Sequence, residues 1–157
     1  MEDKFLIGRT EWCTLPELGI PAIKAKIDTG AKTSALHAFN IRPFRIRGKK
    51  HVRFDIHPIR RSDKILRHCE AEVVDERYIM SSNGHKEHRC VILTPLTIAD
   101  YCWEIELTLS NRDPLTFRML LGREALLGRV LIDPSLACHQ GSLREKKVFA
   151  LYRRAKE

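Results

Sequence analysis

Residues 28–31 read Asp-Thr-Gly-Ala, and their types and order suggest a site for acid–base chemistry. Apolar residues alternate with lysines from Ile23 to Ile27, which predicts a half-buried strand that delivers Asp28 to a loop. Gly30 permits a tight turn there, and the Thr29 hydroxyl can brace the loop by hydrogen bonding. A carboxylate presented in this way can accept and donate a proton, although the same tripeptide also forms ordinary turns.

A second informative segment, residues 117–126, reads Phe-Arg-Met-Leu-Leu-Gly-Arg-Glu-Ala-Leu. Its two apolar residues followed by Gly122 and Arg123 resemble the segment that leads into the short helix near the end of a retropepsin subunit. The two segments also follow each other in the retropepsin order. The resemblance implies that Ala31, Gly122 and Arg123 are structural residues near the site, with the Arg123 guanidinium tying the barrel or a dimer together.

Several runs between Ile7 and Pro134 resemble a bacterial retropepsin-like family that includes the RimB proteins and has carried the label of ATP-dependent zinc proteases. The runs are residues 28–37, 81–89, 106–113, 119–126 and 131–134. The resemblance implies one retropepsin-like domain over residues 1–157, an all-β closed barrel of the acid-protease type with one short helix. It also implies a peptidase that works opposite RimK, a ligase that adds glutamates to the C-terminus of a small-subunit ribosomal protein.

Patterns along the chain agree with an all-β class. Alternating or apolar runs predict strands at residues 52–56, 73–80, 88–93, 105–109 and 115–121. Asn83-Gly84 predicts the tight turn of a hairpin. Only Arg123–Gly128 looks helical, and the residues after Lys146 are expected to form a charged tail that frays.

The length of 157 residues fits one domain with a real core and is short for two lobes. The sequence contains one Asp-Thr-Gly loop, whereas pepsin-type enzymes carry two in one chain. The resemblance therefore implies a homodimer in which two copies of Asp28 meet and titrate as a coupled pair. One carboxylate would activate water while the other protonates the carbonyl oxygen or the departing group.

No charged leader followed by an apolar stretch stands at the start, and no run of about 18 apolar residues could span a bilayer. We therefore expect a cytoplasmic protein with no membrane partner. Five cysteines without a Cys-x-x-Cys pair argue against a disulfide framework and favour reduced thiols.

The net charge of +8 is concentrated in one segment. Between residues 42 and 68 there are ten basic residues and two acids, a surplus that equals the whole net charge. The segment is either a solvated basic loop or a surface for a polyanion. We favour the polyanion surface, with Arg60 and Arg61 among the residues that bind an acidic peptide.

Lys32 and Thr33 follow the Asp-Thr-Gly-Ala run, where retropepsins commonly carry acidic residues that help to receive the substrate backbone. The RimB-like family shares this departure. A cation here would attract an acidic peptide, and a charge-assisted hydrogen bond contributes about 1.5 to 3 kcal/mol. Lys32 could equally point to solvent. His37 could join the site by hydrogen bonding or charge, or it could be structural.

The residues after the Asn-Gly turn, namely His85, Lys86 and Arg89, are further candidates for substrate binding. Their hairpin could close over the substrate as a mobile flap. The turn at Gly48 is an earlier candidate for the same role, and the sequence leaves the choice open.

The zinc and ATP labels of the family have no basis in visible motifs. The sequence has no His-Glu-x-x-His, and its one close pair, His85 and His88, lies beside the Asn-Gly turn. Zinc needs three or four convergent ligands, and His57, His68 and Cys69 would have to supply the others. No Gly-x-x-x-x-Gly-Lys-Ser/Thr or Gly-x-Gly-x-x-Gly loop is present. We expect neither a metal nor a cofactor.

The favoured hypothesis is an aspartic-type peptidase, independent of ATP and zinc, that acts on oligoglutamate tails and could associate with RimK; the sequence leaves open whether it cuts internally or removes residues one at a time. A run of glutamates is a ligand that a basic surface beside a carboxylate pair would select. The alternative is a non-catalytic basic module for RNA, the ribosome or the ligase. Against RNA, the basic segment has only Phe44 and Phe54 as aromatic residues.

Overall fold

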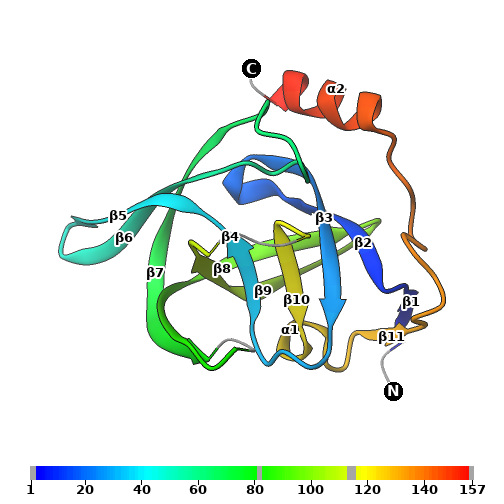
Figure 1. The fold of residues 1–157 in the computed structure, drawn as a ribbon, viewed down its shortest axis with the longest axis horizontal. Helices are drawn as coiled ribbons and strands as arrows, with labels where there is room; N and C mark the ends of the chain where they lie inside the picture. The colour runs from blue at the N-terminus through cyan, green and yellow to red at the C-terminus, as the bar shows by residue number, and fades with distance from the viewer. Residues whose placement is uncertain (1–2, 81–82, 113–115, 156–157) are drawn as a thin grey trace.

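The computed structural model describes residues 3–80, 83–112 and 116–155. Within these ranges the chain forms eleven β-strands, two α-helices and one short 3-10 helix (Figure 1). In chain order the elements are β1 (Phe5–Ile7), β2 (Thr10–Leu15), η1 (Pro16–Leu18), β3 (Ile20–Asp28), β4 (Ser34–His37), β5 (Phe39–Ile46), β6 (Lys49–Ile56), β7 (Arg67–Met80), β8 (Lys86–Ile98), β9 (Tyr101–Ser110), β10 (Met119–Gly122), α1 (Arg123–Leu126), β11 (Val130–Ile132) and α2 (Glu145–Ala155).

The strands form a ring-like arrangement (Figure 1). The larger sheet has the order β2-β3-β10-β4-β9-β8-β7-β6-β5, and β2 also pairs with β8 between Thr14 and Thr97. This additional pairing brings β2 back to β8, while β7, β6 and β5 continue the sheet outward and end in the hairpin at the left of Figure 1. β1 and β11 pair separately in parallel. The predicted all-β class is confirmed.

The core forms because the strand sequences alternate as predicted. Ile23 and Ala25 of β3 are fully buried, and the lysines that alternate with them are not. Leu107 of β9 is also fully buried. Burial of a large aliphatic side chain contributes about 1.5 to 3 kcal/mol, so the alternation fixes which face of each strand turns inward.

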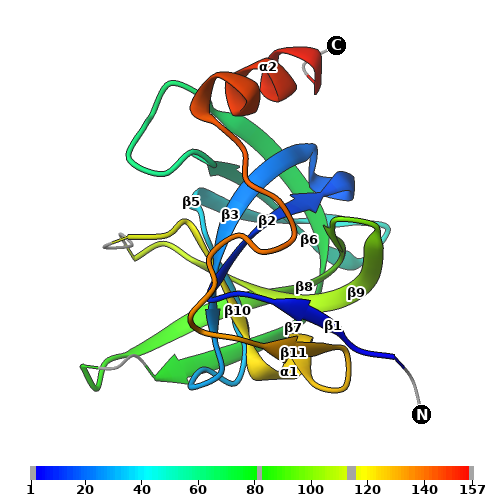
Figure 2. The same cartoon turned by 90° about the vertical axis from the view of Figure 1, so that its right-hand side faces the viewer.

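Helix α2 corrects the prediction of one short helix. A charged, fraying tail was expected after Lys146, but residues Glu145–Ala155 form a helix that contacts β3 (Figure 2). Val148 and Tyr152, one turn apart, are buried, and the Tyr152 hydroxyl donates a hydrogen bond to the Ala22 carbonyl. Such tertiary contacts stabilise a helix whose many charged residues hide its apolar face in the sequence.

A buried carboxylate connects β2 to the segment that follows β11. Glu11 is fully buried and accepts hydrogen bonds from the backbone N–H of Gly8 at 2.7 Å and from those of His139 and Gln140 at 3.0 Å each. These donors offset the large desolvation penalty of a carboxylate in the core. The segment around residues 139–140 is therefore fixed against β2.

The predicted hairpin is the antiparallel pair of β7 and β8, with Gly84 in the left-handed region at φ 84°. Residues 81–82 lie outside the described part, as do residues 113–115, where the sequence predicted a turn and the start of a strand. That strand, β10, begins at Met119. The predicted short helix is α1, and Gly128 follows it at φ 79°.

The five cysteines are free thiols, three of them buried. Burial raises the pKa of Cys69 to about 12, so this thiol stays protonated at neutral pH. Among the described residues, no helix has the length and apolar content that crossing a membrane requires.

Candidate active site

Asp28 is the last residue of β3, and the loop that follows orients its carboxylate. Gly122 of β10 lies opposite Asp28 in parallel register. Asp28 Oδ1 accepts a hydrogen bond from the Gly30 N–H at 3.0 Å, and the Asp28 carbonyl accepts one from the Ala31 N–H at 3.2 Å. Asp28 is half-buried, while Thr29 and Gly30 are exposed. The loop thus presents an oriented carboxylate near the surface.

Two glycines of the site are explained by close approach. The Gly30 backbone is not among the positive-φ glycines, but a Cβ there would lie 3.1 Å from Asp28 Oδ1. A Cβ on Gly122 would lie 2.7 Å from the Thr33 carbonyl carbon and oxygen and 2.8 Å from the Ala31 carbonyl oxygen. These contacts are with backbone, which cannot move aside easily. Only glycine lets β10 pass so close to the loop.

Arg123 braces the loop from the start of α1. Its Nη1 donates hydrogen bonds to the Gly30 carbonyl at 3.2 Å and to the Thr29 carbonyl at 3.4 Å. Its backbone N–H donates to the Ala31 carbonyl at 2.8 Å. Within the described residues the brace uses the Thr29 carbonyl and not its hydroxyl. Arg123 therefore has a structural role that couples α1 to the loop.

Lys32 and Thr33 border a surface cavity of about 590 Å³ between the loop and β7. Tyr78 of β7 and Glu124 of α1 line the same cavity. Lys32 Nζ lies 3.8 Å from Glu124 Oε1, and both side chains are exposed, so this ion pair is weak. The Lys32 ammonium group can thus exchange Glu124 for an incoming carboxylate.

A hydrogen-bonded network supports the start of β4. Arg89 Nη1 donates to Thr108 Oγ1 at 3.2 Å, Thr108 Oγ1 donates to the Ser34 carbonyl at 2.8 Å, and the Gly122 N–H donates to Ser34 Oγ at 3.1 Å. Arg89 Nε also donates to Glu87 Oε1 at 2.7 Å. Burial alone would raise the pKa of Glu87, but hydrogen bonds, chiefly from Arg89, lower it. Arg89, which was predicted to bind substrate, is thus hydrogen-bonded to other residues of the protein.

The other predicted substrate residues lie in different places. His85 and Lys86 are exposed on the β7–β8 hairpin, whose Tyr78 lines the cavity beside Lys32. His37 ends β4, and its ring lies 6.5 Å from that of Phe39. His37 lies three residues after Ser34, the first residue of β4, which is about 10 Å along the strand. The structure therefore places the β7–β8 hairpin near the loop and His37 farther along β4.

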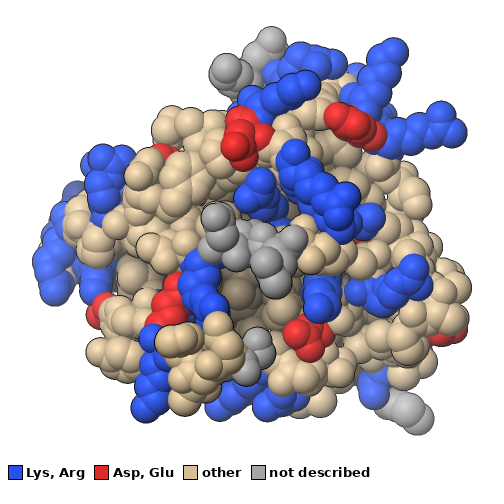
Figure 3. Space-filling model, viewed as in Figure 1, with Lys and Arg blue, Asp and Glu red and all other residues tan. Residues whose placement is uncertain are grey.

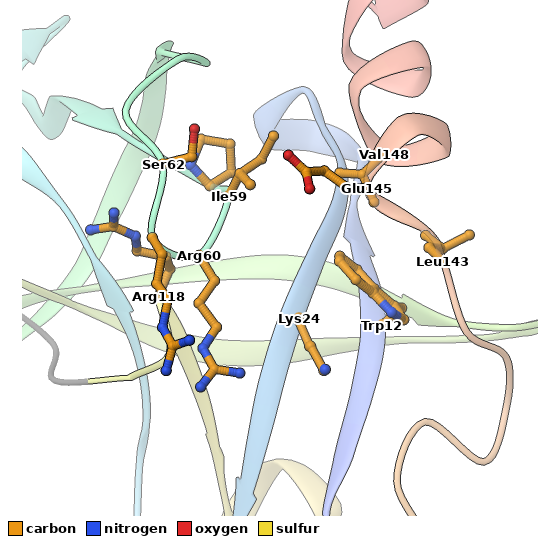
Figure 4. Close-up of a pocket in the computed structure, with 11 residues that line it drawn as sticks. Trp12, Lys24, Ile59, Arg60, Ser62, Arg118, Leu143, Glu145 and Val148 are labelled. Carbon is orange, nitrogen blue, oxygen red and sulfur yellow. The ribbon is translucent and has the colours of Figure 1, made fainter.

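The basic segment of residues 42–68 divides into two surfaces. Its first part forms the β5–β6 hairpin, which extends from the ring and carries Lys and Arg side chains at the left of Figure 3. Arg60 and Arg61 lie in the loop after β6 and line a second cavity of about 390 Å³, together with Arg118 and Lys24 (Figure 4). Figure 3 also shows Lys and Arg side chains at the centre of this face. Neighbours in the sequence thus belong to different surfaces.

Three cations were missed from the sequence: Lys24 and Arg118, which line the second cavity, and Lys26, which lies between Lys24 and Asp28 on β3. Lys24 and Lys26 precede Asp28 on β3, and their alternation with buried residues was a sufficient signal, because it places all three on one face. Arg118 lies just before β10, and only the pairing of β10 between β3 and β4 brings it there. No sequence pattern marks Arg118.

The histidines considered as zinc ligands have other partners. His68 Nδ1 lies 2.6 Å from Asp55 Oδ1, His88 Nε2 lies 3.3 Å from Glu76 Oε1, and His57 Nδ1 lies 3.1 Å from the Ile65 carbonyl. In the described ranges, no three His, Cys, Asp or Glu side chains gather in an arrangement that could hold a metal ion.

An Asp-Thr-Gly carboxylate beside a Gly-Arg turn in an all-β ring defines the retropepsin-like class. The chain belongs to the RimB-like family, described as retropepsin-like aspartic endopeptidase RimB, whose model matches residues 6–142. The family predicted from the motifs is thereby confirmed. Its description supports a peptidase.

Curated relatives carry a different name. Proteins named probable alpha-L-glutamate ligase from Shewanella halifaxensis and Desulfotalea psychrophila are 50% identical to this chain over 151 and 149 residues. The alignments cover 96% and 95% of this chain but 33% and 32% of the relatives. The chain therefore spans about a third of the length of these curated relatives.

A solved structure shares the fold. Lpg0085 of Legionella pneumophila, a protein of unknown function (DUF785), has a TM-score of 0.74 to this chain at 27% identity. The match covers 88% of this chain and 100% of that one.

Proposed function

We propose that this protein is an aspartic-type endopeptidase that cleaves acidic chains. One observation carries the proposal: Asp28 is an oriented, half-buried carboxylate in a loop whose shape Gly122 and Arg123 determine. Lys26 and Lys32 flank this carboxylate in the sequence and are exposed, so an acidic peptide would be attracted to it. The family description supports the reaction class.

The active form that we propose is a homodimer, because one Asp28 lacks the partner that acid–base chemistry at a peptide bond needs. Leu6 and Leu131, opposite each other in the β1–β11 pair, are 37% and 56% exposed, and Leu127 after α1 is 82% exposed. Exposed apolar side chains near α1 favour contact with a second copy. In that dimer the two Asp28 carboxylates would share a proton; one would activate water and the other would protonate the departing group.

The substrate that we propose is an oligoglutamate tail, such as the one that RimK adds to a small-subunit ribosomal protein. Relatives named probable alpha-L-glutamate ligase contain a segment like this chain within about a third of their length. A peptidase segment within a protein that is named a glutamate ligase would act on glutamate chains. RimK is accordingly the proposed partner, and the cytoplasm the proposed compartment.

Mass spectrometry of a glutamate-tailed peptide incubated with wild type and with Asp28→Asn tests the proposal. Wild type should shorten the peptide. Asp28→Asn should leave it intact with a nearly unchanged Tm, because the substitution keeps the shape and removes the acid–base group. Turnover retained in Asp28→Asn would exclude the aspartic mechanism. Sedimentation of a fully active monomer would exclude the dimer.

A second candidate function rests on the β5–β6 hairpin, which is rich in Lys and Arg and extends away from the ring (Figure 1). Arg53 of this hairpin stacks over Phe44 with 4.3 Å from its guanidinium carbon to the ring centroid. Binding of RNA or the ribosome there would weaken steeply with salt and would be independent of Asp28. RNA titrations of wild type and Asp28→Asn at two salt concentrations distinguish the two functions.

A further inference from the structure

The cavity of about 390 Å³ opens between β3, the loop after β6 and α2 (Figure 4). We call it the basic cavity and define it by its four cations, Lys24, Arg60, Arg61 and Arg118. Of the described residues that line it, Glu145 alone is acidic. Its apolar side comes from β2, the loop after β6 and the segment around α2, through Trp12, Ile59, Leu143 and Val148. A pocket with cationic and apolar walls suits a carboxylate on an aliphatic stem.

Neighbouring contacts position the two most central cations. The Arg60 guanidinium stacks over Phe117 at 4.5 Å, and Arg60 Nε is buried with no hydrogen-bond partner among the described residues. Arg118 Nη2 lies 3.6 Å from Asp63, and the Arg118 side chain is only 15% exposed. Figure 4 shows the Arg60 and Arg118 side chains side by side, extending in the same direction. Cations held this close repel one another, and an anion between them removes that repulsion.

Strand β3 links this cavity to the carboxylate of the site. Lys24, Lys26 and Asp28 lie on one face of the strand, because side chains alternate between faces. At about 3.3 Å per residue, Lys24 lies about 13 Å before Asp28 along β3. An extended peptide running alongside covers that distance in about four residues.

We propose, resting on the peptidase function above, that the basic cavity binds a carboxylate of the acidic chain about four residues from the bond that is cut at Asp28. The cavity then makes cleavage depend on the length of the tail. A tail too short to reach the cavity is cut slowly, and a longer tail is bound both in the cavity and at Asp28. Lys26 lies between the two points and neutralises the charge of the intervening residues. Part of the wall, Glu145 and Val148, lies beyond the residues matched by the family model.

Peptides that carry one to eight glutamates after a common neutral sequence test the proposal. For wild type, kcat/KM should rise about tenfold once four or more residues extend from the cut bond, and should then level off. The double variant Arg60→Gln with Arg118→Gln should lose this step, whereas Arg60→Lys, which keeps the charge, should retain most of it. Arg47→Gln with Lys49→Gln, on the β5–β6 hairpin, removes the same charge and should retain the step.

Calorimetric titration of the same peptides into Asp28→Asn, with and without the cavity substitutions, separates binding from cleavage. The step should appear in the affinity and should vanish with Arg60→Gln and Arg118→Gln. Asp28-dependent cleavage without any dependence on length overturns the cavity proposal and leaves the peptidase proposal standing. Absence of cleavage together with a step in affinity overturns the peptidase proposal and leaves binding of the acidic chain in the cavity standing. Loss of affinity for an RNA oligonucleotide, with an unaltered glutamate step, assigns the cavity to nucleic acid and overturns the proposal.

Discussion

The Asp28 loop and the basic cavity share one face of β3 but are constructed differently. Backbone groups hold the loop: Gly122 packs against two of its carbonyls, and Arg123 donates to two more. Side chains hold the cavity, through the stacking of Arg60 on Phe117 and an exposed acid beside Arg118. Acid–base chemistry needs a carboxylate placed within about half an ångström, whereas charge recognition tolerates movement. Substitutions in the loop should therefore abolish peptidase activity, and those in the cavity should reduce it by degrees.

The largest effect is expected from Gly122→Ala. Its Cβ would lie 2.7 Å from the Thr33 backbone, so β10 or the loop must shift, and overpacking of this kind destabilises by about 1 to 3 kcal/mol. Both the Tm and the activity should fall. Gly30→Ala is the matched control, because its Cβ approaches only the Asp28 carboxylate. It should lose activity with a smaller change in Tm, and equal loss of Tm in both variants would contradict the comparison.

Lys32→Glu should have the next largest effect, because Lys32 belongs to the loop and carries a charge. The substitution places a carboxylate near Asp28, which should repel an acidic substrate where it is cut. Both kcat and kcat/KM should fall for a glutamate peptide. A change in KM alone would show that Lys32 acts only in binding.

Charge reversal in the cavity, Arg60→Glu with Arg61→Glu, should raise KM more than it lowers kcat. These residues line the cavity together with Lys24, which lies about 13 Å from Asp28 along β3, and contribute binding that is common to the ground state and the transition state. The KM of wild type should rise with salt, since exposed charges are screened over about 8 Å at physiological ionic strength, and the variant should lose this dependence. A fall in kcat with constant KM would place the two arginines in the chemistry.

The smallest effect is expected from the same reversal on the β5–β6 hairpin, Arg47→Glu with Lys49→Glu. Both side chains are exposed, and the hairpin extends away from the ring, so only long-range attraction should weaken. At physiological salt, kcat/KM should stay within about twofold of wild type. A loss as large as that of the cavity variant would show that the basic segment acts as one surface.

The sequence predicted the elements whose conformation is determined by neighbouring residues. The strand that ends at Asp28, the turn at Gly84 and the short helix after Gly122 all follow from alternation, turn chemistry and motif order. The basic segment was treated as one surface because its charges are consecutive. A hairpin reverses the chain within that segment, and the loop after β6 then carries Arg60 to the cavity that it shares with Lys24 and Arg118.

The features that the sequence did not reveal depend on distant contacts. Arg118 reaches the cavity because β10 inserts between β3 and β4. Helix α2 forms because Val148 and Tyr152 pack on strands more than a hundred residues earlier in the chain. Local propensity is a weak guide where such packing decides the structure.

The hydrogen bonds to Glu11 set an order of events during synthesis. The donors from His139 and Gln140 lie 128 and 129 residues after the carboxylate that they satisfy. While the residues after Cys138 are still inside the ribosome, every ring strand has already emerged. Glu11 then lacks two of its three hydrogen-bond donors and resists burial. Closure of β2 into the core is thereby postponed until residues 139 and 140 have left the ribosome, and early release of an incomplete chain yields a species with this strand exposed.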